Sequence, residues 1–170
     1  MNRGRTHMKT RISAVLIALL AMLGLNAGSA QAITYNQLAN NYYVGAGSLC
    51  ATPKGNSTAN GTIITTWSCT GSDLQQWTYQ GQYIVHEASG KCLTPQGNAS
   101  SSNGAVLTLW TCDWSYGSPQ RFVVANYPAR VYTTWGAKCI TNYGGSMANG
   151  VYLTLWTCAY GQVPEQNWSI

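Results

Sequence analysis

One sequence pattern occurs three times in this chain of 170 residues. In each copy a cysteine is followed about twenty residues later by Trp-x-Cys and then by Gln-x-aromatic. The copies comprise Cys50, Trp67, Cys69, Gln75 and Trp77; Cys92, Trp110, Cys112, Gln120 and Phe122; and Cys139, Trp156, Cys158, Gln166 and Trp168. The glutamines are 45 and 46 positions apart. A repeat of this period predicts a threefold architecture with up to three equivalent sites.

The first 32 residues have the features of a secretory signal peptide. A basic start is followed by the apolar run 12–25 and by the small-x-small triplet at 30–32. The apolar run is shorter than the roughly 20 residues that span a bilayer, which disfavours a membrane anchor. We therefore predict a signal peptide over 1–32 and a secreted, extracellular mature chain of residues 33–170 with no membrane span.

The charge of the mature chain indicates no nucleic-acid partner. Four of the nine Lys and Arg residues lie in the leader, so five face four Asp and Glu in residues 33–170, a net charge of +1. Binding to a phosphate backbone needs a basic stripe, and this composition supplies none.

All six cysteines follow the leader, and export would place them in an oxidising compartment. Six cysteines allow 15 pairings, but only pairing within each copy keeps the copies equivalent. The predicted disulfides are Cys50–Cys69, Cys92–Cys112 and Cys139–Cys158. Zinc binding would favour tight Cys-x2-Cys pairs, which the sequence lacks, so we predict no metal site.

Short β-rich segments separated by turns predict an all-β fold. Tyr83–His86, 91–94 and 105–110 are rich in strand-forming residues, and no segment shows helical periodicity. Asn-Gly pairs recur at 60–61, 103–104 and 149–150, where hairpin turns are expected. Units of about 45 residues would also suit propeller blades, but propellers typically need four or more. Three disulfide-linked units favour a closed three-lobed barrel.

The motifs resemble the ricin B-chain-like lectin domain, also called the Gln-x-Trp repeat or family 13 carbohydrate-binding module. The resemblance rests on Gly-Lys-Cys-Leu-Thr at 90–94, Asn-Gly-x-x-Leu-Thr-Leu-Trp-Thr-Cys at 103–112 and Gln-x-Trp at 75–77 and 166–168. It implies one β-trefoil domain of twelve strands over 33–170, with repeats at about 42–82, 83–127 and 128–170. Each lobe would offer a shallow sugar site.

In this family the Gln-x-aromatic triplets form part of the core. The resemblance implies that the glutamines bond buried backbone and that the aromatic rings fill the barrel. These structural residues are Gln75, Gln120, Gln166, Trp77, Phe122 and Trp168.

The family also places a sugar on an aromatic ring near the second cysteine, because the C–H face of a pyranose lies flat on a π-system. The aromatic positions are Trp67, Trp110 and Trp156, although core packing is an alternative role. The family's sugar-binding Asp is replaced by Thr52, Thr94 and Thr141, which lack its charge. A family Gln two residues before each Trp is replaced by Thr65, Thr108 and Thr154. Asp113 and Asn142 are candidate substitutes for the missing acid in the second and third lobes.

These features favour a secreted, stand-alone carbohydrate-binding module whose partner is a polysaccharide or glycan. The alternative is a protein-interaction trefoil, an inhibitor or targeting subunit of a separate secreted enzyme or toxin. We do not expect an enzyme, because His86 is the only histidine after the leader and the four acidic residues are scattered, whereas glycoside hydrolysis uses two facing carboxylates. No cofactor is predicted.

Overall fold

The computed structural model of the protein describes residues 37–40 and 47–170, which belong to one compact unit. The predicted signal peptide, residues 1–32, lies outside the described residues and stays a prediction. Residues 33–36 and 41–46 are not described either. Of the described part, no helix is long and apolar enough to cross a membrane.

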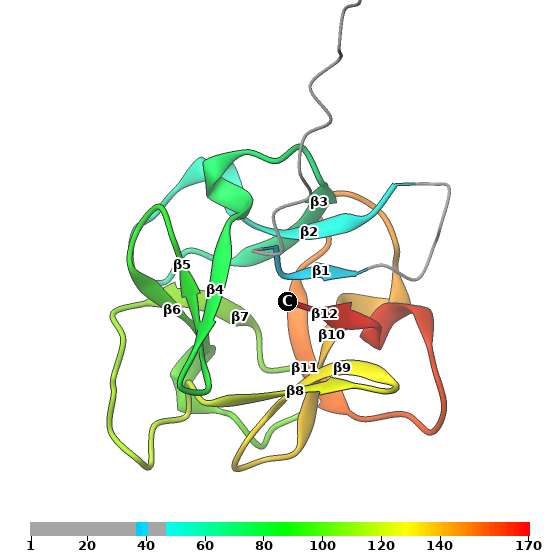
Figure 1. Ribbon diagram of the computed structural model, residues 1–170. Helices are drawn as coiled ribbons and strands as arrows, with labels where there is room; N and C mark the ends of the chain where they lie inside the picture. The colour runs from blue at the N-terminus through cyan, green and yellow to red at the C-terminus, as the bar shows by residue number, and fades with distance from the viewer. Residues whose placement is uncertain (1–36, 41–46) are drawn as a thin grey trace, which may run out of the picture. The chain divides into compact units, whose positions relative to one another are not determined.

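The described residues form twelve short strands connected by turns and five single 3-10 turns (Figure 1). The strands are β1 (Ala39–Asn40), β2 (Leu49–Pro53), β3 (Ile64–Ser68), β4 (Trp77–Gln80), β5 (Tyr83–His86), β6 (Lys91–Pro95), β7 (Leu107–Trp110), β8 (Phe122–Asn126), β9 (Ala129–Thr133), β10 (Lys138–Asn142), β11 (Leu153–Thr157) and β12 (Trp168–Ser169). The 3-10 turns are η1 (Lys54–Asn56), η2 (Asp73–Gln75), η3 (Gln96–Asn98), η4 (Tyr143–Gly145) and η5 (Pro164–Gln166). The all-β prediction is confirmed.

The strands form three antiparallel four-stranded sheets in the orders β12-β1-β2-β3, β4-β5-β6-β7 and β8-β9-β10-β11. Figure 1 shows β12 beside β1, so the two ends of the described chain share one sheet. Each Gln-x-aromatic triplet ends in the residue that begins the edge strand of a sheet: Trp77 in β4, Phe122 in β8 and Trp168 in β12. The sheets are therefore offset from the sequence repeats, and the predicted three-lobed β-trefoil is confirmed.

The hairpins β2–β3, β6–β7 and β10–β11 contact one another in a ring. Three equivalent hydrogen bonds join them: the backbone N–H groups of Gly61, Gly104 and Gly150 donate to the carbonyls of Leu109, Leu155 and Thr66 at 2.8, 2.8 and 2.7 Å. Each glycine is the second residue of an Asn-Gly pair and has a φ of +80° to +83°. The pairs form turns as predicted, but each lies inside a longer connection between its two strands instead of joining them directly.

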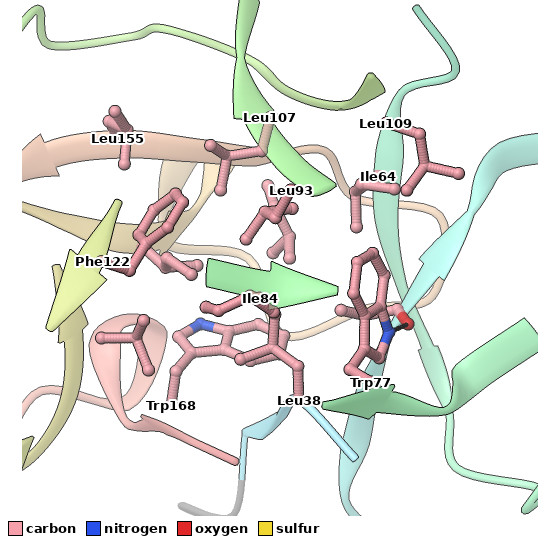
Figure 2. Packing of buried hydrophobic residues seen from close by; sticks show 14 residues of the cluster. Leu38, Ile64, Trp77, Ile84, Leu93, Leu107, Leu109, Phe122, Leu155 and Trp168 are labelled. Atoms are coloured by element: carbon pink, nitrogen blue, oxygen red, sulfur yellow. Dashed lines mark hydrogen bonds between the residues drawn. The ribbon is translucent and has the colours of Figure 1, made fainter. Parts of the chain in front are cut away.

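Aromatic and aliphatic side chains fill the space between the sheets. Trp77, Phe122 and Trp168 are fully buried and belong to one cluster with residues such as Ile84 and Leu93 (Figure 2). The indole N–H of Trp77 donates to the carbonyl oxygen of Ala51 at 2.9 Å, which satisfies its one buried donor. The triplet aromatics are therefore the largest side chains of the shared core.

The three predicted disulfides are confirmed. Cys50–Cys69, Cys92–Cys112 and Cys139–Cys158 each link the first strand of a hairpin to the residues after its second strand, and no described cysteine is free. The loops they close span 19 or 20 positions, so each removes about 3 kcal/mol of chain entropy from the unfolded state. The bridges fix the hairpins that carry the candidate sugar sites.

Candidate functional site

Two surface hollows lie at equivalent positions of the first and second lobes. The first has a volume of about 480 Å³ and is lined by Thr52, Thr65, Trp67 and η1, among others. The second, of about 270 Å³, is lined by the matching Thr94, Thr108, Trp110 and η3. In both lobes the threonines are buried or half-buried, whereas the tryptophan and the 3-10 turn are exposed, so the threonines are called the base threonines. These hollows are named the Trp67 hollow and the Trp110 hollow.

Strand register explains why these residues meet. Thr52 lies opposite Thr65, and Cys50 lies opposite Trp67, in the β2–β3 pair. Side chains two positions apart point to the same face of a strand, so the two threonines share a face with Trp67 and the disulfide. The opposite face carries Ala51 and Ile64 into the core. The pairs β6–β7 and β10–β11 have the same register.

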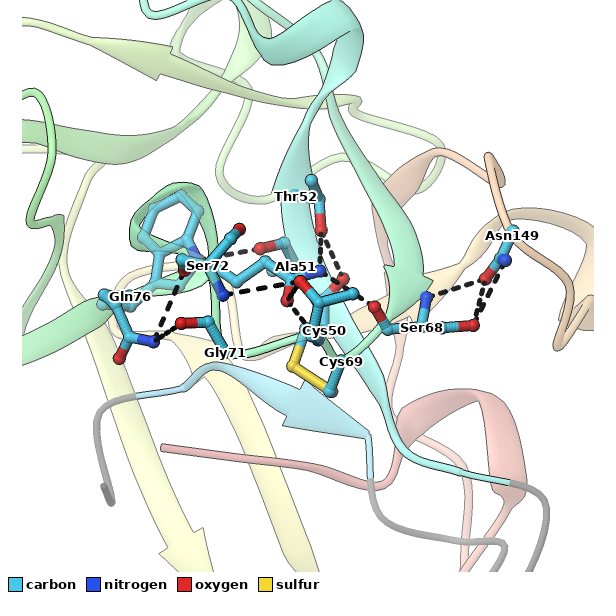
Figure 3. The surroundings of a disulfide bond; sticks show 12 residues. Cys50, Ala51, Thr52, Ser68, Cys69, Gly71, Ser72, Gln76 and Asn149 are labelled. Atoms are coloured by element: carbon cyan, nitrogen blue, oxygen red, sulfur yellow. Dashed lines mark hydrogen bonds between the residues drawn. A yellow bond between two sulfur atoms is a disulfide. The ribbon is translucent and has the colours of Figure 1, made fainter. Parts of the chain in front are cut away.

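The base threonines present hydrogen-bond acceptors. Thr52 Oγ1 donates to the carbonyl oxygen of Cys50 at 3.1 Å (Figure 3). The same oxygen accepts from Gln75 Nε2 at 3.0 Å. Thr65 Oγ1 donates to the carbonyl oxygen of Thr52 at 3.1 Å. A hydroxyl has one hydrogen and two lone pairs, so both hydrogens are used inside the fold. Each oxygen therefore keeps acceptor capacity and has no hydrogen left to donate to a ligand.

The triplet glutamines hold these threonines in place. Gln120 Nε2 donates to Thr94 Oγ1 at 2.9 Å and to the carbonyl oxygen of Thr111 at 3.0 Å, while its Oε1 accepts from the backbone N–H of Asp113 at 2.7 Å. Gln75 and Gln166 make the same three types of bond. All three glutamines are buried. Each one therefore ties a base threonine to the loop that follows its second cysteine.

The three site tryptophans are about half exposed, at 48%, 49% and 48% for Trp67, Trp110 and Trp156. Each is contacted by the Asn-Gly turn of another lobe: a Cβ built on Gly150, Gly61 or Gly104 would lie 3.9, 3.7 or 3.8 Å from the respective ring. Figure 3 shows the adjoining link from Ser68 to Asn149, whose Oδ1 accepts from the Ser68 backbone N–H at 2.8 Å. One part of each ring is therefore held by protein and another faces solvent.

Asp113 and Asn142, the candidate substitutes for the missing acid, both make hydrogen bonds within their own loops. Asp113 is exposed but is not among the residues lining the Trp110 hollow; its carboxylate accepts from the backbone N–H and hydroxyl of Ser115 at 3.1 and 3.0 Å. Asn142 is fully buried, and its amide donates to the carbonyl oxygen of Ser146 at 2.9 Å. The structure therefore does not bring Asp113 to the base threonines, and Asn142 organises the loop around η4.

No carboxylate lines the Trp67 or Trp110 hollow in the part of the chain that the structure describes. The third-lobe residues keep the same bonds: Thr141 Oγ1 donates to the carbonyl of Cys139, and Thr154 Oγ1 donates to the carbonyl of Thr141. Thr141 is only 8% exposed. Thr52, which is partly exposed, is the most accessible of the three threonines that replace the family's Asp.

The 3-10 turns were missing from the sequence-based site. Gly55 and Asn56 of η1, and Gly97 and Asn98 of η3, line the two hollows with φ between +58° and +65°. Only glycine and, less readily, asparagine adopt this region at low cost, so the recurring Gly-Asn after the first cysteine was an available signal. The asparagine amides add polar groups to the rim.

His86 has a structural environment. Its ring is fully buried 4.8 Å from the Trp77 ring, with Nε2 3.1 Å from the carbonyl oxygen of Leu74 and Nδ1 2.9 Å from Ser89 Oγ. A carbonyl only accepts, so Nε2 carries the proton and Nδ1 accepts from the serine hydroxyl in the neutral ring. Burial lowers the pKa of His86, against the opposing effects of the Leu74 hydrogen bond and Glu87. Across the described residues, no three His, Cys, Asp or Glu side chains form a metal-binding group.

Comparison with known proteins identifies the family. The model of the ricin-type beta-trefoil lectin domain matches residues 22–122, more than half of the chain, so the chain belongs to this family. The third repeat lies beyond that range, and its equivalence rests on the repeated register and hydrogen bonds described above. No curated protein matches the sequence.

Solved structures show the same fold. The chain is similar to an exo-beta-1,3-galactanase from Clostridium thermocellum, with 25% identity and a TM-score of 0.63 over 79% of this chain and 29% of the enzyme. It is also similar to the agglutinin of Abrus precatorius, with 22% identity and a TM-score of 0.59 over 71% and 43% of the two chains. For the C-half of an earthworm R-type lectin the identity is 13% and the TM-score 0.58, over 72% and 89%.

Proposed function

We propose that this protein is a glycan-binding lectin module without catalytic activity, and that it holds sugar units in the Trp67 and Trp110 hollows. The observation that carries the proposal is the recurrence of a half-exposed tryptophan beside two acceptor hydroxyls at equivalent positions of two lobes. Membership in a lectin family supports carbohydrate binding in general. The earthworm relative is in complex with GalNAc, which supports a sugar as the ligand class.

The tryptophans and threonines of the hollows fit a sugar ring and its hydroxyls, and Lys54, whose Nζ donates to the Tyr152 hydroxyl, adds one cationic group to the lining of the Trp67 hollow. An indole face offers the apolar surface that a pyranose ring covers, and the base threonines accept hydrogen bonds from sugar hydroxyls. Because no lining carboxylate adds charge, each such bond is worth roughly half of a charge-assisted one. Single sites should therefore be weak, and useful strength should come from engagement of several lobes by one polymer.

The proposal includes export. Three disulfides are typical of proteins that fold in an oxidising compartment, and this agrees with the predicted signal peptide at 1–32. Expression of the full chain, followed by intact mass and N-terminal sequencing of protein from the culture medium, would test it. A chain that stays inside the cell with residues 1–32 attached would contradict this part.

A glycan array with the oxidised protein, followed by calorimetry on the best oligosaccharide, tests the binding sites. Trp67→Ala and Trp110→Ala should each weaken binding by roughly five- to tenfold, since aromatic stacking contributes about 1 kcal/mol. The matched control is Trp135→Ala, because Trp135 is equally exposed at 48% but lies in neither hollow. If the double variant, still folded, binds like the Trp135 control, the site assignment is wrong.

A second candidate, a protein-interaction role, is favoured by one feature outside the hollows. Trp114, Tyr116 and Trp135 are 57%, 77% and 48% exposed, and the rings of Tyr116 and Trp135 lie 5.3 Å apart. Exposed aromatic side chains of this kind are enriched at protein interfaces. A protein that binds no glycan on the array, but retains one secreted protein through these three side chains, would favour this candidate.

A further inference from the structure

A third hollow lies away from the Trp67 and Trp110 hollows, between the β8–β9 turn and the loop after Cys158. It has a volume of about 580 Å³, and Tyr127, Arg130, Tyr160 and Gly161 are among its lining residues. Tyr127 and Tyr160 are almost completely exposed, at 91% and 103%. It is called the Arg130 hollow here. None of its lining residues belongs to either of the other two hollows.

Comparison with the second lobe shows which side chains differ around this hollow. Trp77 pairs with His86 and Phe122 with Thr133, so Tyr83 and Arg130, each three residues earlier on its strand, occupy equivalent positions. Tyr83 donates its hydroxyl to the carbonyl oxygen of Ser115 at 2.9 Å. The Arg130 guanidinium donates to the carbonyl of Gly161. Gly161 lies three residues after Cys158, just as Ser115 lies three residues after Cys112, so the two carbonyls are at equivalent positions.

The second and third lobes differ in the side chains beside this equivalent hydrogen bond. In the second lobe the Trp114 ring packs 4.6 Å from the Tyr83 ring and covers it. In the third lobe Tyr160 stands in the position of Trp114 and is fully exposed, and an arginine replaces the partner ring. The β8–β9 hairpin is also one residue pair longer than β4–β5, which carries Tyr127 farther out at its turn. The space that an aromatic pair closes in one lobe is open in the other.

The charge in this hollow is unbalanced. Arg130 uses one guanidinium hydrogen for the Gly161 carbonyl, and an arginine has five N–H donors. No Asp or Glu lines the hollow, and no described carboxylate forms an ion pair with Arg130. A planar guanidinium matches a carboxylate through two parallel hydrogen bonds. The flanking tyrosines supply ring faces and hydroxyls of the kind that hold a sugar.

We propose that the Arg130 hollow binds a carboxylate-bearing sugar unit of an acidic polysaccharide, with the guanidinium on the carboxylate and the tyrosine rings against the pyranose. A volume of about 580 Å³ lies within the range of small-molecule sites. This site is independent of the Trp67 and Trp110 hollows and would give the module a second specificity. A polyglutamate chain would satisfy the arginine, but its side chains have no ring face for the two exposed tyrosines.

Calorimetry on the full, oxidised protein with oligogalacturonate and with its methyl ester tests the proposal, because the ester keeps the ring and loses the charge. The acid should bind and the ester should bind at least tenfold more weakly. Arg130→Gln should weaken binding of the acid about tenfold, and Tyr127→Ala with Tyr160→Ala should weaken it several-fold. Raising the salt concentration should weaken binding to the natural protein more than to Arg130→Gln, because screening acts on the charge pair.

The matched control is Lys138→Gln, which removes the same charge from the same lobe; Lys138 contacts Thr157 and does not line the hollow. Arg130→Lys keeps the charge but cannot make two parallel hydrogen bonds to a carboxylate, so it should bind the acid with intermediate affinity. Equal losses in Arg130→Gln and Lys138→Gln, or equal binding of acid and ester, would overturn the proposal. So would Arg130-dependent binding of polyglutamate in place of the sugar acid. Neutral glycan binding should be unchanged in Arg130→Gln, which separates this site from the tryptophan hollows.

Discussion

Replacing Gln120 by methionine should destabilise the fold by about 3 kcal/mol. Methionine has a similar length but cannot make the three hydrogen bonds to Asp113, Thr94 and Thr111. The bond to Thr94 is buried, and the threonine keeps its own bond to the Cys92 carbonyl, so the loss of the Gln120 bond costs about 1–1.5 kcal/mol. The other two bonds are partly buried, and water can replace them in part, so each contributes about 0.5–1 kcal/mol.

Urea unfolding of the oxidised protein, followed by tryptophan fluorescence, measures this change as a shift of the midpoint at constant m-value. The equivalent changes at Gln75 and Gln166 should cost similar amounts, because each glutamine makes the same three types of bond. Gln80→Met serves as control, since Gln80 is exposed at the end of β4. A loss below about 0.5 kcal/mol in Gln120→Met, equal to that of the control, would refute the reasoning.

Three further predictions concern stability. Burial lowers the pKa of His86, so as the pH falls through about 6.5 the unfolded chain takes up a proton that the folded chain does not. The free energy of unfolding should therefore decrease as the pH is lowered from about 7.5 to about 5.5. Urea titrations of His86→Gln should show a smaller dependence of this free energy on pH. Gly61→Ala should cost about 1–2 kcal/mol at its φ of +83°, whereas Gly117→Ala, in open space without a positive φ, should cost nothing measurable by the same titration. Replacing Cys92 and Cys112 together by alanine should cost about 3 kcal/mol, and an unchanged urea midpoint would contradict the entropic account of this bridge.

Much of the fold follows from the sequence because the repeat constrains it. Three equivalent cysteine pairs at 19 or 20 positions predict the same short-range pairing in every copy, and the structure contains that pairing. The segment Tyr83–His86 is a strand as predicted, since its β-branched and aromatic residues favour one. By contrast, the sequence predicted Asn-Gly turns but not that the turns contact another lobe, because such contacts join residues more than 40 positions apart.

The site was predicted only in outline. The recurring tryptophans beside the second cysteine and the Thr-for-Asp replacement just after the first were both visible as a pattern. Which hydroxyl hydrogens are already used was not visible, because that depends on the strand pairing that lets Thr65 donate its hydrogen to the carbonyl oxygen of Thr52 across 13 positions. The carboxylate of Asp113 looked available from its spacing, but it bonds Ser115 two residues on, as aspartates in turns often do.

The sequence by itself determined a threefold, disulfide-linked all-β fold, because a pattern repeated three times fixes spacing and pairing regardless of the contacts in space, and the family resemblance added that this fold is a β-trefoil. The tertiary structure decided what each copy presents to solvent. It turns the threonines into acceptors and holds each tryptophan against the glycine of another lobe. It also leaves Arg130 in an open hollow, where the second lobe packs the Tyr83 and Trp114 rings against each other. These properties arise from contacts between distant segments, whose geometry a local pattern does not contain.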